Sequence, residues 1–259
     1  MSIRQFYQQA ASVNLNGSIV SAGILCIILT AGLLFSWNFP LFPVAIPYVL
    51  VSLLHYNNYL LNRNKWAMAS DSFHRFGDKN FLEINQMLIA FAPAPAIRMI
   101  FFSPDGMLAG ELRELKTSFW RWVLPYFIDK RVKKSFGIYD SHGHLRATLI
   151  QEQHGVRMLN EQNEIAGFYY SKRAESGVGI AVLSGGRKMR VTEWMGDIRL
   201  ENEDSATASR LRRGWMPLEW TSHFKDAQTS VLSFEYTTCE AERIAMFTAL
   251  THRFMYRDH

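Results

Sequence analysis

The residues with the clearest chemical character lie between Lys116 and Lys134. Six basic residues stand there against a single acid, Asp129, with aromatic and aliphatic side chains between them. A basic residue near an anionic leaflet gains about 1 kcal/mol, and aromatic side chains prefer the interface between headgroups and acyl chains. The segment therefore predicts contact with anionic phospholipid headgroups. The candidate lipid-binding residues are Lys116, Trp120, Arg121, Trp122, Lys130, Arg131, Lys133 and Lys134.

The alternative places the aromatic residues of this segment in a protein core, with the basic residues as a solvated edge. The charge distribution favours a surface role. The chain has 28 Lys and Arg against 23 Asp and Glu, a net charge of +5, and residues 116–134 carry an excess as large as that of the whole chain. A domain that is basic in one place only is unlike a general nucleic-acid-binding protein, so no nucleic-acid partner is expected.

A second basic cluster precedes Trp215 and consists of Arg210, Arg212 and Arg213. The planar guanidinium group suits phosphate, so this cluster is a secondary candidate for headgroup binding. The alternative is pairing within a loop, because an acidic run lies just upstream. That run is Glu201, Glu203 and Asp204.

Three histidines, His142, His144 and His154, occur close together, but two of them flank Gly143 in a predicted turn, and a zinc site needs three or four ligands at suitable spacing. The cysteines Cys26 and Cys239 are too far apart in the predicted organisation to form a disulfide framework. No nucleophile elbow, phosphate loop or dinucleotide motif is present. We therefore expect a non-enzymatic protein with no metal or other cofactor.

The elements that must position these residues begin with a membrane segment, Gly17 to Leu61, which is 45 residues long and contains no Asp, Glu, Lys or Arg. One helical crossing of a bilayer takes about 20 apolar residues, so this length predicts a hairpin of two transmembrane helices. The residues from Trp37 to Pro40 suit the turn between them, because Trp favours the interface and Pro cannot continue a helix.

The flanks of this hairpin set its orientation. Arg4 precedes the first span, and Arg63 and Lys65 follow the second. Because Lys and Arg near span ends prefer the cytoplasm, we expect a multi-pass protein of the cell membrane with both termini cytoplasmic, residues 1–16 forming the N-terminal tail. A cleaved signal peptide is the alternative, but its apolar region is usually only about 7 to 15 residues long.

Residues 62–96 are predicted to be a linker that contains a short helix. Apolar residues recur at helical spacing from Phe81 to Phe91, and Pro93 follows. This helix is expected to pack on the adjoining domain, and the alternative is a helix that binds a partner protein.

From Ile97 the apolar period changes to two, which predicts short strands joined by tight turns. Seven to ten strands at this spacing predict an antiparallel sandwich or barrel. The expected strands are 97–102, 107–113, 136–139, 145–151, 156–159, 165–170, 178–183, 188–194, 197–201 and 230–236.

The last predicted element is a helix from Glu240 to Tyr256. Its apolar residues fall on nearly every side of the helix, which is typical of a buried helix. The fold expected for residues 97–259 is therefore mainly β, an antiparallel β-barrel that encloses a hydrophobic C-terminal helix.

This arrangement resembles the tubby C-terminal fold, shared with LURP-one-like proteins. The resemblance is to bacterial tubby-like domains and covers about residues 97–257. The similar motifs are 136–143 (FGIYDSHG), 214–220 (GWMPLEW) with 224–226 (FKD), 231–234 (VLSF) and 253–257 (RFMYR).

The resemblance implies a domain that associates with membrane lipid through basic residues on the barrel, and it assigns no individual lipid contact in this chain. The resulting expectation is a membrane-anchored protein whose barrel binds anionic lipid or a membrane-associated partner. Two alternatives stay open. One is a scramblase-like protein that moves lipid, for which His55, Asn57 and Asn58 offer polar groups near the membrane. The other is a scaffold that recruits an unidentified soluble protein.

Overall fold

The computed structural model divides the chain into two compact units, Met1–Asp71 with Ser222–Lys225, and Ser72–Thr221 with Asp226–His259. Each unit is described by itself. The structure describes residues 1–34, 41–70, 81–93, 96–116, 133–171, 178–214, 216–226 and 228–255.

The first unit contains two long helices, α1 (Ile3–Leu34) and α2 (Leu41–Met68). Helix α1 begins well before the apolar segment, so most of the predicted N-terminal tail is helical. Among the residues that the structure describes, α1 is the one helix long and apolar enough to cross a membrane. Helix α2 carries Pro47 and the polar residues His55, Asn57 and Asn58, which make it less apolar. The structure therefore supports a possible span at α1 and leaves the predicted second span without that support.

The two helices contact each other through polar side chains. The hydroxyls of Ser18 and Ser52 lie 3.1 Å apart, and His55 Nδ1 lies 3.3 Å from Asn14 Oδ1. Gly17 allows this approach, because a Cβ atom there would lie 3.1 Å from His55 Nδ1. Polar groups that would be costly in an apolar medium are thus paired between the helices.

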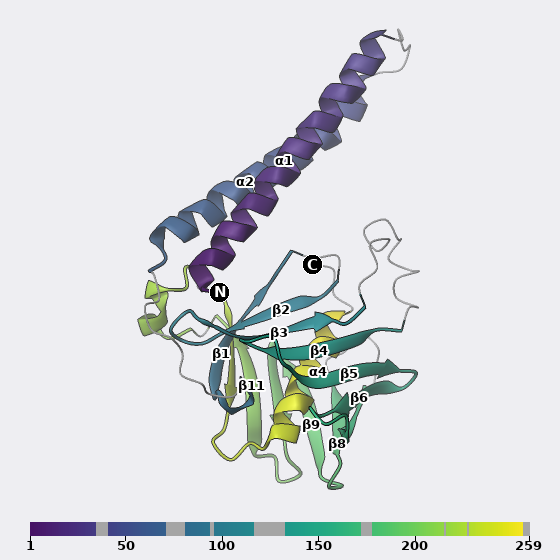
Figure 1. Ribbon diagram of the computed structural model, residues 1–259, viewed down its shortest axis with the longest axis vertical. Helices are drawn as coiled ribbons and strands as arrows, with labels where there is room; N and C mark the ends of the chain where they lie inside the picture. The colour runs from purple at the N-terminus through teal and green to yellow at the C-terminus, as the bar shows by residue number, and fades with distance from the viewer. Residues whose placement is uncertain are drawn as a thin grey trace. The chain divides into compact units, whose positions relative to one another are not determined.

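The second unit is a closed antiparallel β-barrel with strand order β1-β12-β11-β10-β9-β8-β7-β6-β5-β4-β3-β2 (Figure 1). Closure pairs both edges of the sheet, so the barrel has no open edge. The strands are β1 (Gln86–Phe91), β2 (Arg98–Phe102), β3 (Leu108–Glu114), β4 (Ser135–Asp140), β5 (Leu145–Glu152), β6 (Gly155–Leu159), β7 (Ile165–Ser171), β8 (Gly179–Leu183), β9 (Lys188–Trp194), β10 (Asp197–Glu201), β11 (Thr207–Arg213) and β12 (Ser230–Phe234).

The structure corrects the predicted helix at Phe81–Phe91. Phe81–Glu83 forms a short 3-10 helix, η1, and the following residues form strand β1, which pairs with β2 and β12. Met87, Leu88 and Ile89 are all buried, so the strand is apolar on both faces and shows no alternation. A continuous apolar run of this length fits a helix and a strand equally well, which explains the wrong prediction.

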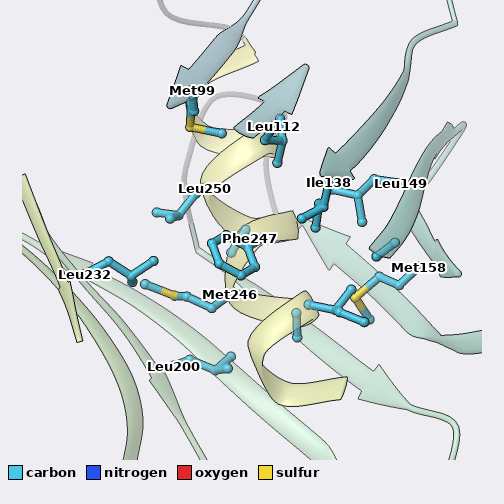
Figure 2. Packing of buried hydrophobic residues seen from close by; sticks show 14 of the residues in the cluster. Met99, Leu112, Ile138, Leu149, Met158, Leu200, Leu232, Met246, Phe247 and Leu250 are labelled. Atoms are coloured by element: carbon cyan, nitrogen blue, oxygen red, sulfur yellow. The ribbon is translucent and has the colours of Figure 1, made fainter. Parts of the chain in front are cut away.

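Helix α4 (Glu240–Met255) contributes to the apolar core of the barrel unit and contacts strands β6, β7, β8 and β11. Figure 2 shows Met246, Phe247 and Leu250 of this helix among core side chains of the strands. The Phe247 ring lies 5.2 Å from that of Phe81, 5.0 Å from that of Phe101 and 5.8 Å from that of Phe234. The prediction of a buried C-terminal helix is confirmed for the described residues.

The N-terminus of α4 is capped by the carboxylate of Glu242. Glu242 Oε2 accepts a hydrogen bond of 2.9 Å from the Cys239 backbone N–H, and Glu242 Oε1 accepts one of 2.7 Å from Arg187. A carboxylate at this position satisfies an otherwise unpaired N–H group and complements the positive end of the helix dipole. Glu242 therefore fixes the start of the helix.

Candidate functional site

The strand order sorts the connections of the barrel between its two ends. Because successive strands are antiparallel, the connections that follow odd-numbered strands meet at one end, and those that follow even-numbered strands meet at the other. Lys116 and Lys133, which lie close to the end of β3 and the start of β4, and Arg213 at the end of β11 belong to the first end. The two basic clusters singled out in the sequence therefore leave the barrel at the same end.

The two ends differ in charge. By sequence, the connections that follow β1, β3, β5, β7, β9 and β11 contain nine basic and four acidic residues. The connections that follow the even-numbered strands contain six acidic residues and one basic residue, Arg187. We call these the basic end and the acidic end. The barrel is thus polarised along its axis, which produces an electrostatic potential of opposite sign at its two ends.

The predicted lipid-binding residues fall into three groups. Lys116 and Lys133 are exposed at the basic end. Lys134 is buried, with 9% of its surface exposed, and its carbonyl oxygen accepts a 2.9 Å hydrogen bond from the Gln151 N–H. Lys134 therefore differs from Lys116 and Lys133 in being buried. The remaining candidates, Trp120, Arg121, Trp122, Lys130 and Arg131, lie outside the described residues.

The second basic cluster lies on strand β11, not in a loop. Arg210 pairs with Asp197 of β10, and Arg199, directly opposite Arg210, donates to the same carboxylate at 3.1 Å. Burial opposes ionisation of Asp197, but the hydrogen bonds from Arg210 and Arg199 outweigh it and lower its pKa. Arg210 is thus held in an internal ion pair, whereas Arg213 at the end of β11 is exposed.

The acidic run considered as an alternative partner for this cluster lies elsewhere. Glu203 and Asp204 belong to the connection between β10 and β11, at the acidic end, whereas Arg212 and Arg213 finish β11 at the basic end. The length of β11 therefore separates the two acids from the two arginines. Pairing of Arg212 and Arg213 with Glu203 and Asp204 is therefore excluded by the topology.

Sequence reasoning missed an apolar tip at the basic end, the turn between β9 and β10. Trp194 is 71% exposed and Met195 is 90% exposed. Trp194 pairs with Asp197, so Met195 and Gly196 form a two-residue turn, with φ angles of 49° and 81°. Such turns favour Asn-Gly or Asp-Gly, and a Met-Gly turn is the signal that could have drawn attention to this site.

A cavity of about 400 Å³ opens beside Lys133 at the basic end. Tyr169 in its wall is buried, and burial, with a smaller contribution from Glu193, raises the pKa of its hydroxyl. The described part of the chain contains no group of three or more His, Cys, Asp or Glu residues that could hold a metal ion. The lining residues are Lys133, Glu152, Gln153, His154, Gly155, Val156, Phe168, Tyr169 and Tyr170.

His142 and His144 belong to the acidic end and support a turn. Their backbone N–H groups each donate a 2.9 Å hydrogen bond to Asp140 Oδ1, and Arg146 donates to Asp140 Oδ2. Burial raises the pKa of Asp140, but the hydrogen bonds from His144, Arg146 and His142 outweigh this and lower it. The network fixes the hairpin between β4 and β5, and His154 lies at the opposite end.

Comparison of the chain with protein-family models, with curated proteins and with solved structures gives no match. The resemblance to tubby-like domains therefore remains a prediction based on short motifs.

Proposed function

We propose that this chain is a non-enzymatic membrane-anchored protein whose β-barrel binds anionic phospholipid headgroups through its basic end. The single observation that carries the proposal is that exposed Lys116, Lys133 and Arg213, which come from two basic clusters far apart in sequence, lie at one end of the barrel. Exposed Lys116, Lys133 and Arg213 supply cations there, and a basic residue near an anionic leaflet gains about 1 kcal/mol.

The proposed anchor is a hairpin of α1 and α2 that crosses the cell membrane twice. The uncharged segment from Gly17 to Leu61 supports it, as do the polar contacts between the helices. Arg4, Arg63 and Lys65 then favour cytoplasmic termini, with the barrel on the cytoplasmic side. The anchor keeps the barrel close to the leaflet, so a modest affinity for headgroups is enough for contact.

The architecture is also in keeping with the tubby-like resemblance. A closed antiparallel barrel with a buried C-terminal helix is the fold that the motifs imply, and we propose that α4 fills the interior of the barrel. Side chains from β2, β12 and η1 contact Phe247, and strands β6, β7 and β8 contact the same helix. Such a barrel is a rigid support for charged groups at its ends.

The contacts of the described residues bear differently on the two alternatives. A scaffold that recruits a partner through a helix at 81–91 loses its basis, because Phe81, Leu82 and Met87 are buried in the barrel unit. A scramblase-like path needs polar groups available to headgroups. Of the three polar residues proposed for it, His55 contacts Asn14, whereas Asn57 and Asn58 are exposed.

Flotation with vesicles tests the proposal. A fragment of residues 66–259 should float with vesicles that contain phosphatidylserine or phosphatidylglycerol, and added salt should release it, because screening weakens surface electrostatics. The double variant Lys133→Gln/Arg213→Gln should bind more weakly. The matched control Lys188→Gln/Arg190→Gln removes two exposed charges that lie away from the basic end and should bind like the parent.

Circular dichroism first establishes that each fragment is folded. A folded parent fragment that stays in solution with anionic vesicles at low salt would contradict the proposal. Equal loss of binding in the two double variants would also contradict it, because net charge alone would then explain the binding.

A further inference from the structure

We infer that Trp194 and Met195 form a wedge that inserts into the boundary between headgroups and acyl chains of an anionic leaflet. This inference rests on the proposed function and assigns a second, apolar part to the same membrane contact. Trp194 and Met195 are 71% and 90% exposed, and they are adjacent at the tip of one hairpin. A large aromatic and a flexible thioether together at a tip expose apolar surface that the fold itself does not use.

The turn does not require these residue types. Met195 has a φ angle of 49°, in the left-handed region that Gly, Asn and Asp adopt most readily. A long side chain with a Cβ atom is less favourable there by about 1 kcal/mol. Neither the turn geometry nor core packing therefore explains Met195, whereas insertion into a membrane does.

The tip stands on a rigid base. Trp194 closes the β9–β10 ladder opposite Asp197, and the Asp197 carboxylate binds both Arg199 and Arg210. Because this ion-pair group joins β10 to β11, the hairpin keeps its direction at the end of the barrel. A side chain on a fixed hairpin loses little conformational entropy when it inserts.

The charges beside the tip indicate an anionic bilayer as the occupant. Ile198 pairs with Leu211, and continuing this register places Arg212 beside Asp197 and Arg213 beside Gly196. Cations one strand away from an inserted apolar tip would lie at the level of lipid phosphates. Trp also prefers that depth, where its ring is apolar and its N–H can reach polar groups.

Site-specific labelling of the full-length chain in lipid nanodiscs tests the wedge. Cys26→Ala and Cys239→Ser remove the native thiols, and Met195→Cys then carries an environment-sensitive fluorophore. In nanodiscs with phosphatidylglycerol, its emission should shift to the blue, and lipids with a nitroxide near the headgroup should quench it. Tyr236→Cys is the matched control, because Tyr236 is also 90% exposed but lies at the acidic end. Its label should report water throughout.

The outcomes separate the wedge from the proposed function. If the label at position 195 reports water while the 66–259 fragment still binds anionic vesicles in a salt-sensitive way, the wedge is wrong and the proposed function stands. If neither the label nor the fragment responds to anionic lipid, both are wrong. A blue shift without quenching by nitroxide lipids indicates burial against protein and overturns the wedge. The variant Trp194→Ser/Met195→Asn should reduce vesicle binding of the fragment without changing its circular dichroism.

Discussion

The guanidinium of Arg243 donates a 2.7 Å hydrogen bond to the carbonyl oxygen of Ile84, which joins the buried helix α4 to the segment that leads into β1. The same side chain donates to Asn85 Oδ1 at 2.7 Å and lies 4.7 Å above the Phe234 ring. Burial lowers the pKa of this arginine, with Glu83 acting in the opposite direction. A buried cation on α4 is therefore held by acceptors at Ile84 and Asn85, which lie far from it in the sequence.

Arg243→Met should destabilise the barrel by about 3 kcal/mol, because hydrogen bonds to a buried charged group are strong and their loss leaves buried acceptors unpaired. Urea unfolding of the 66–259 fragment measures this as a lower midpoint with an unchanged slope. Arg190→Met, at an exposed position on β9, is the control and should have little effect. Equal midpoints for the two variants would refute the structural role of Arg243.

Phe247→Ala should be more damaging, at about 3 to 5 kcal/mol, because it removes a ring that contacts Phe81, Phe101 and Phe234 in the core. Thermal unfolding followed by circular dichroism provides the measurement. Leu218→Ala, at a side chain that is 86% exposed, should leave the transition unchanged. A small effect at Phe247 would mean that α4 is not packed inside the core.

Ten of the twelve strands could be expected from the sequence, and the two that were missed have specific causes. Strand β1 lacks alternation because both of its faces are buried. In β11 the inward positions are Ser209 and Leu211, so only one large apolar residue marks the core face. Neither strand carries the period of two that identifies a half-buried strand.

The missed strand β11 also determined the interpretation of the candidate site. Without it, residues 202–229 would form one long connection in which Arg210, Arg212 and Arg213 follow Glu203 and Asp204 directly. Because β11 runs the length of the barrel, Glu203 and Asp204 lie at one end of it, and Arg212 and Arg213 lie at the other. The basic residues could be identified from the sequence. Their position at one end of the barrel depends on the number of strands between them, which the sequence analysis did not predict correctly.

His252 gives the barrel a pH-dependent stability. Burial lowers the pKa of the His252 imidazole to about 4. Its ring lies 5.5 Å from the ring of Tyr169. The next residue of α4, Arg253, forms an ion pair with Glu193. Because the folded pKa is below the unfolded value of about 6.5, the unfolded chain binds the proton more readily. This contribution is fully present above pH of about 6.5 and is lost as pH falls toward 4.

Urea unfolding between pH 7.5 and pH 4.5 checks this expectation. The parent fragment should keep its stability down to a pH of about 6.5 and lose it progressively below that value, and His252→Gln should flatten the dependence. Asp140 and Asp197 also have lowered pKa values, but a carboxylate loses its contribution only below its unfolded pKa of about 4, so their effect lies at lower pH. An unchanged slope in His252→Gln would exclude His252 as the origin.

Asp197→Asn tests how the ion pairs of β10 and β11 limit the charge of the basic end. The Asp197 carboxylate neutralises one of the two arginines that it binds, so its replacement should increase the affinity for anionic vesicles. The free energy of unfolding of the barrel should fall by about 1 kcal/mol, because the hydrogen bonds to Arg210 and Arg199 become weaker. Flotation at several salt concentrations and urea unfolding measure the two effects. Glu203→Gln removes one negative charge at the acidic end and should change neither. If the two variants bind vesicles equally, the charge near Asp197 is remote from the lipid, and the basic end does not make the contact.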